Sequence, residues 1–358
     1  MLHQGNKVAV VEIGGSHDEC LLSQFSALKQ AKCHVTFIGT QDLWERNTFF
    51  HDLVDVFHPI SFSKKAVADF KIMRNLNRFF VNENIEKVIL NTAQGAHIRN
   101  LCLTASSKVE FIGIVHTLNK FKGSFTQKLI HTKIKKYFVL NDYFLSKIIP
   151  PKGIRISSFY PLEFPHFDLT IQKSPSENWL AIIGGVENRR KDLVGCISLM
   201  KQLKEENVKF IFLGKSNFNS EEVKLFKEEL VENELTDKVI LFDKFVSSEL
   251  FDAYLKQTDF IWPLVHPNTP SADEYFKNQI SGAMNVSFAY KIPLLVHEVY
   301  FADWKDLHYS FSYSVESFSE CFKKAQAEKE KVKKALLETE KFTRHFQAEK
   351  YVDFIFTA

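Results

Sequence analysis

The sequence predicts an α/β protein made of two doubly wound domains that face a central cleft. Short apolar runs alternate with helical patterns along most of the chain, and a proline-rich stretch interrupts this alternation near the middle. The length of 358 residues also exceeds the roughly 100–200 residues of one ordinary domain. Strands that alternate with helices favour parallel sheets covered by helices on both faces.

The first predicted domain covers residues 1–150. Its expected strands are Val8–Ile13, His34–Ile38, Lys87–Leu90, Phe111–Val115 and Tyr137–Leu140. Helical patterns are clearest at Ala66–Phe80 and Phe125–Ile134. Residues 150–175 hold five of the ten prolines, and proline lacks the N–H group that regular structure needs. We therefore expect a linker over residues 151–175.

The second predicted domain covers residues 176–325 and repeats the alternation. Its expected strands are Trp179–Ile183, Lys209–Leu213, Val239–Phe242, Phe260–Trp262 and Pro293–Val296. Its expected helices are Leu193–Glu206, Glu221–Asn233, Glu249–Gln257 and Gly282–Tyr290. A strongly helical tail follows over 326–358, and we expect it to pack back on the N-terminal domain.

Composition excludes several classes of protein. The net charge of +3 is too small to indicate nucleic-acid binding. The five cysteines are widely spaced with no Cys-x-x-Cys pair, which indicates neither a disulfide frame nor a zinc site. No apolar run reaches the roughly 18 residues of a membrane span, and the N-terminus does not resemble a signal peptide. We expect a cytoplasmic protein, or one on the inner face of the cell membrane.

Two turns between a strand and a helix could bind phosphate. Gly184-Gly185 follows a predicted strand and leads to Arg189, Arg190 and Lys191 at a helix start, where a helix dipole favours anions and a bound phosphate would also attract cations. The alternative is a solvated basic turn. Ser281-Gly282 precedes another helix, and the alternative there is an ordinary capped helix. Two such turns on one domain would suit a diphosphate.

Several segments of the second half resemble, in order, the C-terminal domain of the large retaining GT-B glycosyltransferases (the group 1, family 4-like enzymes). They are WLAIIGGVENRRKDLVGCISLMKQL, VKFIFLGK, KVILFDKFVSSELFDAYLKQTDFIWPL and ISGAMNVSFAYKIPLLV. The resemblance implies two Rossmann-like domains and an enzyme that transfers a sugar from a nucleotide-diphosphate donor.

The resemblance also implies roles for residues of the basic loop and the base-binding turn. Lys191 stands at the position of the family's diphosphate-binding lysine. The family's arginine position is Val186 here, so Arg189 or Arg190 would have to replace it. The turn at Phe245-Val246, with Val246 as the contact, would lie against the nucleotide base.

The family's acidic motif is altered in this chain. Its two glutamates fall on Asn278 and Val286, and neither is acidic. Asn285, one residue away, is expected to hydrogen-bond a ribose hydroxyl, and Glu274, with Asp273 beside it, is expected to reach the sugar. A family variant that carries Ser-Gly at the helix start resembles Ser281-Gly282, and there backbone amides bind more of the phosphate.

The first half carries two further similarities. Gly14-Gly15 resembles the family's glycine loop, which approaches the donor phosphate. His116 resembles the family's active-site histidine and would contact the transferred sugar. A lone histidine at a strand end is also a common structural hydrogen-bonder, so both readings of His116 stay open.

The resemblance predicts a retaining, metal-independent hexosyltransferase that uses a UDP- or GDP-sugar and a saccharide or lipid-linked acceptor, in surface polysaccharide or glycoconjugate synthesis. The chain has no Asp-x-Asp motif to hold a divalent ion and no dinucleotide fingerprint, so neither metal nor cofactor is expected. The alternatives are a nucleotide-sugar epimerase of the same fold and a degenerate transferase that only binds.

The segment Lys120–Lys136 holds six lysines and no acid, with apolar residues at helical spacing. Such a helix can lie on an anionic membrane, which would suit a lipid-linked acceptor. The alternative is a helix whose apolar face packs on its own sheet.

Overall fold

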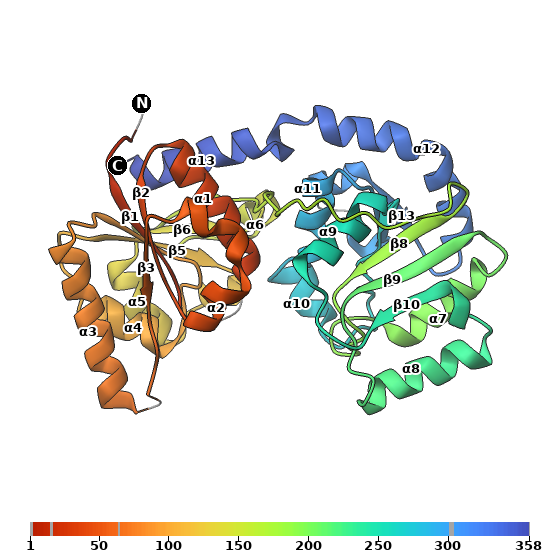
Figure 1. The fold of residues 1–358 in the computed structure, drawn as a ribbon, viewed down its shortest axis with the longest axis horizontal. Coiled ribbons are helices and arrows are strands. Elements are labelled where there is room, and N and C mark those ends of the chain that lie inside the picture. Colours follow the sequence, from red (N-terminus) through yellow and green to blue (C-terminus); the bar gives the residue numbers. More distant parts are fainter. Residues whose placement is uncertain (1–2, 15–16, 64, 301–303, 358) are drawn as a thin grey trace. The chain divides into compact units, whose positions relative to one another are not determined.

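Two parallel sheets organise the chain in the computed structural model, which describes residues 3–14, 17–63, 65–300 and 304–357. The first sheet has seven strands in the order β3-β2-β1-β4-β5-β6-β7, and the second has six in the order β10-β9-β8-β11-β12-β13. Each belongs to its own compact unit (Figure 1). The fold class predicted from the sequence, two doubly wound α/β domains, is confirmed.

Unit 1 consists of Met1–Phe164 and Thr343–Ala358. Its strands are β1 (Lys7–Glu12), β2 (His34–Gly39), β3 (Val56–Pro59), β4 (Lys87–Leu90), β5 (Glu110–Val115), β6 (Lys136–Val139) and β7 (Arg155–Ser158). Its helices are α1 (Leu21–Gln30), α2 (Gln41–Arg46), α3 (Ala66–Asn82), α4 (Gly95–Leu103), α5 (Phe125–Lys133), α6 (Asp142–Lys147) and α13 (Arg344–Phe356).

Helices cover both faces of the first sheet. Apolar side chains of α3, α4 and α5 pack with β1, β4 and β5 in one buried cluster, while α1 and α13 pack against each other on the opposite face (Figure 1). Because both faces are covered, the central strands are apolar along their length: Val8 to Val11 are at most 1% exposed. This burial explains the continuous apolar runs of the sequence.

Unit 2 spans Pro165–Phe342. Its strands are β8 (Asn178–Ile183), β9 (Val208–Lys215), β10 (Val239–Phe242), β11 (Phe260–Ile261), β12 (Leu294–His297) and β13 (Ser310–Tyr313). Its helices are α7 (Leu193–Gln202), α8 (Glu221–Glu232), α9 (Ser248–Gln257), α10 (Ala272–Lys277), α11 (Gly282–Tyr290) and α12 (Phe318–Glu338).

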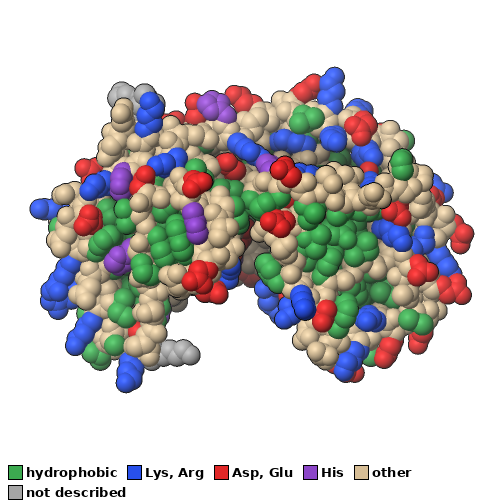
Figure 2. All heavy atoms as spheres, in the orientation of Figure 1, with side chains coloured by type: hydrophobic (Ala, Val, Ile, Leu, Met, Phe, Trp, Pro, Cys, Tyr) green, Lys and Arg blue, Asp and Glu red, His purple; other side chains and the backbone are tan. Residues whose placement is uncertain are grey.

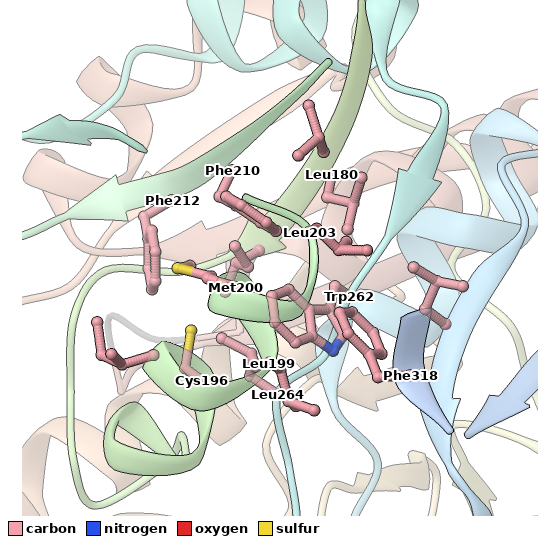
Figure 3. Close-up of a cluster of buried hydrophobic side chains, with 14 of the residues drawn as sticks. Leu180, Cys196, Leu199, Met200, Leu203, Phe210, Phe212, Trp262, Leu264 and Phe318 are labelled. Carbon is pink, nitrogen blue, oxygen red and sulfur yellow. The ribbon is translucent and has the colours of Figure 1, made fainter. Parts of the chain in front are cut away.

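The core of unit 2 lies between the sheet and the helices α7, α8 and α12. Trp262 is fully buried there and stacks on Phe318 with 5.0 Å between the ring centroids. Figure 3 shows these rings beside Met200 and Leu199 of α7. Offset stacking of this kind adds stability beyond the area that the rings bury.

The boundaries of the units differ from those expected. The predicted linker over 151–175 contains β7, which pairs in parallel with β6 and completes the first sheet, because the stretch from Ile154 to Tyr160 is free of proline. The predicted tail over 326–358 is divided between the units: α12 belongs to unit 2, whereas α13 belongs to unit 1.

Candidate functional site

The strand order of each sheet reverses at one point, between β1 and β4 in unit 1 and between β8 and β11 in unit 2. In open α/β sheets, ligands bind at such points, outside the carboxyl ends of the strands. We call the segments there the β1–β4 edge (residues 12–14 and 17–19, Asn91, Thr92 and the nearby His116) and the β8–β11 edge (residues 184–192, 264–271 and 281–285).

Glycines allow two loops to pack tightly at the β8–β11 edge. Gly184 follows β8 with φ +95°, a conformation that favours glycine. A Cβ atom on Gly185 would lie 1.8 Å from the carbonyl oxygen of Lys215, and one on Gly214 would lie 2.4 Å from the carbonyl carbon of Gly184. The backbones after β8 and β9 therefore touch, and no side chain fits between them.

Lys191 lies beneath this glycine turn. It is only 7% exposed, and its Nζ donates to the carbonyl oxygen of Ile183 over 2.7 Å. Burial lowers the pKa of Lys191 to about 8. In contrast, Arg189 and Arg190 are exposed, and Arg190 pairs with Glu187 over 3.2 Å. The two arginines are thus solvated in this structure and the lysine is not, and their contacts with a diphosphate stay predictions.

The helix after the basic loop begins at the residue expected from the sequence. Helix α7 starts at Leu193, and Asp192 is its N-cap, with a side chain that accepts from the N–H of Gly195 over 2.9 Å. An acidic cap suits the positive end of a helix. The three cations Arg189, Arg190 and Lys191 therefore precede the cap and do not stand in the first turn of the helix.

A buried chain of hydrogen bonds holds Asp192, and the sequence analysis missed it. The Asp192 carboxylate lies 2.8 Å from Nδ1 of His266, whose Nε2 lies 2.7 Å from the Tyr313 hydroxyl. That hydroxyl also accepts from the indole N–H of Trp262 over 2.7 Å. The hydrogen bond from His266 is the main cause that lowers the pKa of Asp192. The members come from three distant segments, so no sequence spacing signals the chain.

The segment 264–271 fastens the basic loop at two points. The carbonyl oxygen of Leu264 accepts from the N–H of Asp192 over 3.0 Å. The carbonyl oxygen of Arg189 accepts from the N–H of Ser271 over 3.1 Å and from its hydroxyl. Burial raises the pKa of the nearby Tyr275 hydroxyl of α10, and the charges of Arg190 and Arg189 oppose this rise. The loop is thus fixed before any ligand binds, which limits the entropy that binding costs.

Helix α11 begins at the same edge. Ser281 is its N-cap residue, but among the described residues its side chain makes no capping bond. A Cβ atom on Gly282 would meet nothing within 4 Å. Asn285 is 5% exposed, and its Oδ1 has no hydrogen-bond partner among the residues that the structure describes. Free amides, open space and an unsatisfied buried acceptor are what a phosphorylated ribose would need.

The acidic residues expected near the sugar lie on α10. Glu274 is half-buried, and its carboxylate accepts from the side-chain amide of Asn278 over 3.2 Å. Asp273 is exposed and pairs with Lys277. Val286 is buried.

At the predicted base-binding turn before α9, Val246 is 6% exposed and Phe245 is 82% exposed. Their ligand contacts stay predictions.

A buried carboxylate organises the β1–β4 edge. Glu12 is 1% exposed, and it accepts from the N–H of Gly14 over 2.7 Å, from Asn91 over 2.8 Å and from the Thr92 hydroxyl over 2.7 Å. Burial raises the pKa of Glu12 although these bonds oppose the shift. Glu12 thus holds the start of the predicted glycine loop through its bond to Gly14. Gly15, the other glycine of that loop, lies outside the described residues.

His116 follows β5 with a fixed tautomer. Its Nε2 lies 2.7 Å from the carbonyl oxygen of Asn91, and a carbonyl can only accept, so Nε2 carries the proton. Its buried Nδ1 is an acceptor with no partner among the described residues. Burial lowers the pKa of His116 to about 4, so the ring is neutral near pH 7. His116 therefore makes the structural hydrogen bond through Nε2 and keeps Nδ1 as an acceptor that a ligand hydroxyl could use.

Two residues that the sequence analysis missed lie beside His116. The ring of His17 stacks on that of His116, with 3.6 Å between centroids, and His17 Nδ1 lies 3.2 Å from the Glu19 carboxylate. Among the described residues, these three form the one group of three or more whose possible metal-ligand atoms lie within 4.8 Å of one another. Stacked rings direct their in-plane lone pairs side by side, however, so the two imidazoles do not converge on one ion.

Several residues of the lysine-rich segment 120–136 pack within unit 1. Ile130 and Ile134 are buried in the core, and Lys136 is buried against Glu110. Phe125 is 76% exposed beside the exposed Lys122 and Lys128, so any membrane contact would use these side chains and stays a prediction. No helix of the described residues is long and apolar enough to cross a membrane.

Comparison with solved structures identifies the fold. A glycosyltransferase from Rickettsia africae superposes with a TM-score of 0.70 at 11% identity, covering 99% of this chain and all of that one. The HepE protein of Anabaena, solved in complex with UDP, gives 0.65 at 10% identity over 97% and 98% of the two chains. No protein-family model and no curated protein matches the sequence.

The chain has the GT-B fold. Epimerases share this architecture: a putative UDP-N-acetylglucosamine 2-epimerase from Listeria monocytogenes gives a TM-score of 0.62 at 12% identity, covering 97% of this chain and 95% of that one. In this GT-B chain the two edges carry different groups. The β8–β11 edge of unit 2 has a lysine beneath a glycine turn, whereas the β1–β4 edge of unit 1 has imidazoles beside carboxylates. On the face that Figure 2 shows, basic and acidic side chains are interspersed over the surface.

Proposed function

We propose that this chain is a glycosyltransferase that moves a sugar from a UDP- or GDP-sugar to a saccharide or lipid-linked acceptor, in the synthesis of surface polysaccharide or glycoconjugate. The observation that carries the proposal is the buried ammonium of Lys191 beneath the Gly184 turn. Among the described residues this ammonium has one hydrogen-bond acceptor. A buried cation with so few partners is costly, and a diphosphate would stabilise it. The neighbouring GT-B structures, one of them with UDP, support this choice of ligand.

The leaving diphosphate would be neutralised without a metal ion. Lys191 supplies a fixed charge, the exposed Arg189 and Arg190 can turn toward the phosphates, and the first amides of α11 at Ser281-Gly282 add their dipole. Asn285 Oδ1 would accept a ribose hydroxyl. We further propose that His116 contacts the sugar through Nδ1, which has no partner among the described residues. Glu274, on the helix α10 that borders the basic loop, would also reach the sugar.

Titration calorimetry with UDP and GDP tests the diphosphate site. Lys191→Met keeps the length of the side chain but removes the charge, so we expect the affinity to fall at least tenfold, as for the loss of a charge-assisted hydrogen bond. Lys201→Met on the exposed face of α7 is the matched control and should bind like the wild type. Failure of both nucleotides to bind at millimolar concentration, or equal binding by Lys191→Met, would refute the proposal.

An epimerase is the second candidate, because structures of UDP-N-acetylglucosamine 2-epimerases share the fold over nearly the full chain. Such an enzyme changes the sugar of the nucleotide donor without any acceptor. Incubation with a panel of UDP- and GDP-sugars alone, followed by chromatography of the intact nucleotides, separates the two functions. A new nucleotide sugar would favour the epimerase, whereas release of free sugar and nucleotide would favour the transferase.

A further inference from the structure

Four polar side chains of unit 2 form a line of hydrogen bonds that ends beside Lys191. They come from the end of β11, the end of β13, the loop after β11 and the N-cap of α7, and they are Trp262, Tyr313, His266 and Asp192. The first three are at most 2% exposed. We call these four residues the Asp192 network. Buried polar groups are stable only when they are paired, so each side chain of the network depends on its neighbours.

The two ends of the Asp192 network fix the direction of its hydrogen bonds. The indole N–H of Trp262 can only donate, and the Asp192 carboxylate can only accept. The Tyr313 oxygen accepts from Trp262 over 2.7 Å, and its own hydrogen can then bond to His266 Nε2, which lies 2.7 Å away. The other ring nitrogen, Nδ1, donates to Asp192 over 2.8 Å. A neutral ring thus uses every donor and acceptor along the line, and the line cannot run the other way.

Asp192 is fixed through both its side chain and its backbone. One carboxylate oxygen accepts from His266, and the other accepts from the N–H of Gly195 over 2.9 Å. The backbone N–H of Asp192 donates to the carbonyl oxygen of Leu264 over 3.0 Å. Lys191 is the preceding residue, and its Nζ reaches back to Ile183. The position of the Lys191 ammonium therefore depends on how firmly Asp192 is held.

From this geometry we propose that His266 is a positioning residue of the diphosphate site, which holds the Lys191 ammonium in place through its hydrogen bond to Asp192. The inference rests on the proposed function. His266 acts without touching the ligand, since its side chain is 3% exposed and that of Asp192 is 15% exposed. A charge that is already in place costs less entropy when a ligand binds. The ends of β11 and β13 thus decide where the charge of another loop lies.

A role in stability alone is the alternative, and the two roles differ in which hydrogen bond matters. The side-chain amide of asparagine lies close to the place of Nδ1 in histidine, whereas that of glutamine lies close to the place of Nε2. His266→Asn can therefore still donate to Asp192, but His266→Gln cannot. Positioning predicts that the asparagine variant keeps the affinity for the ligand and that the glutamine variant loses it. A role in stability alone predicts no such difference.

Titration calorimetry with UDP at pH 7 tests the positioning role. We expect His266→Gln to bind about fivefold more weakly and His266→Asn to stay within about twofold of the wild type. Asp192→Asn keeps a good N-cap but turns an amide N–H toward His266 Nδ1. It should weaken binding about threefold, although removal of a negative charge by itself favours an anion. The double variant should bind no more weakly than His266→Gln, because both changes break one bond.

The pH dependence of UDP binding reports where the Lys191 ammonium lies. Burial lowers the pKa of Lys191 to about 8, and the charged and titratable groups that act on it are Glu187, Arg190 and Cys196. If His266→Gln releases the lysine to solvent, its pKa returns toward the usual value. Between pH 7 and 8.7 the affinity of the wild type should fall, whereas that of His266→Gln should be weaker at pH 7 and nearly constant. A loss of stability alone would leave the wild-type profile.

Lys329→Met is the control for stability. Lys329 pairs with Asp259 over 2.7 Å at the amino end of β11, at the opposite end of the sheet from the Asp192 network. This variant should be less stable in urea but should bind UDP like the wild type.

Three results would overturn the positioning role: wild-type affinity of His266→Gln, equal losses in His266→Asn and His266→Gln, or a loss in Lys329→Met. If urea unfolding shows that His266→Gln does not fold, Asp192→Asn decides by the same measurements, and wild-type affinity in that variant would overturn the role. Failure of the wild type to bind either UDP or GDP would instead refute the proposed function.

Discussion

The two reversal points of the sheets occupy equivalent places in their units. A charged side chain is buried at each of them, but the two charges have opposite signs. At the β1–β4 edge Glu12 is held by three hydrogen-bond donors. At the β8–β11 edge Lys191 is held by one carbonyl oxygen. The carboxylate is nearly satisfied from within the fold, whereas the ammonium still has donors to spare. Glu12 therefore shapes a loop, whereas the role proposed for Lys191 is to bind a ligand.

The neighbours of each buried charge follow the same division. Around Glu12 lie imidazoles and carboxylates, groups that exchange protons near neutral pH. Around Lys191 lie glycines, arginines and the starts of two helices, which suit an anion. The side chains at the strand ends thus suit proton transfer on unit 1 and phosphate binding on unit 2, because these side chains, and not the sheets, carry the chemistry of a fold.

The largest expected effect concerns the close approach of backbones at the β8–β11 edge. Gly185→Ala would place a Cβ 1.8 Å from the carbonyl oxygen of Lys215, so the loops must separate, at a cost of about 3 kcal/mol. Urea unfolding measures this loss. Gly282→Ala, with open space around it, is the control and should keep the wild-type stability. Equal stability of both variants would show that the loops are not in contact.

The buried carboxylate of the other edge should matter somewhat less. Glu12→Ala leaves the donors of Asn91 and Thr92 without their acceptor, which we expect to cost about 2 kcal/mol. Its pKa is raised above the usual 4.5, so the folded state gains stability relative to Glu12→Gln as the pH falls from 7 toward that value. Unfolding of both proteins at several pH values checks the sign, and a constant difference would contradict it.

Binding of UDP should weaken as the pH rises through about 8, since Lys191 loses its proton there. Above pH 7 the phosphates of UDP no longer titrate, and at still higher pH its uracil ring also loses a proton, so calorimetry from pH 7 to 8.7 isolates the lysine. We expect a decrease of about fivefold to tenfold. Lys191→Met should show weak binding that no longer depends on pH, and a parallel decrease in that variant would assign the titration to another group.

The smallest effect should come from Asn285. Its buried Oδ1 lacks a partner among the described residues, so Asn285→Leu should leave the stability within about 0.5 kcal/mol or raise it. If the oxygen accepts a ribose hydroxyl, UDP binding falls about fivefold, whereas inorganic diphosphate binds unchanged. Equal loss for both ligands would place the residue near the phosphates and not the ribose.

The sequence was sufficient wherever a local pattern decides the structure. Continuous apolar runs marked the buried strands β1, β4 and β8, and Gly184-Gly185 marked the tight turn after β8, since such a turn depends on adjacent residues. Strands β3 and β13 were missed because they lie at the edges of their sheets and their sequences, VFHP and SFSY, are not continuous apolar runs. Strand β7 was hidden among prolines, and pairing with β6 decides its conformation.

Tertiary structure decided what depends on residues far apart in the chain. Nothing in the sequence relates Asp192 to His266 and Tyr313, or Glu12 to Asn91, yet these contacts fix both loops. The burial of Lys191 and the stacking of His17 on His116 likewise arise only when the strands lie side by side. The sequence thus determined which residue types stand at the strand ends, and the sheets, by their order and register, determined which of them meet.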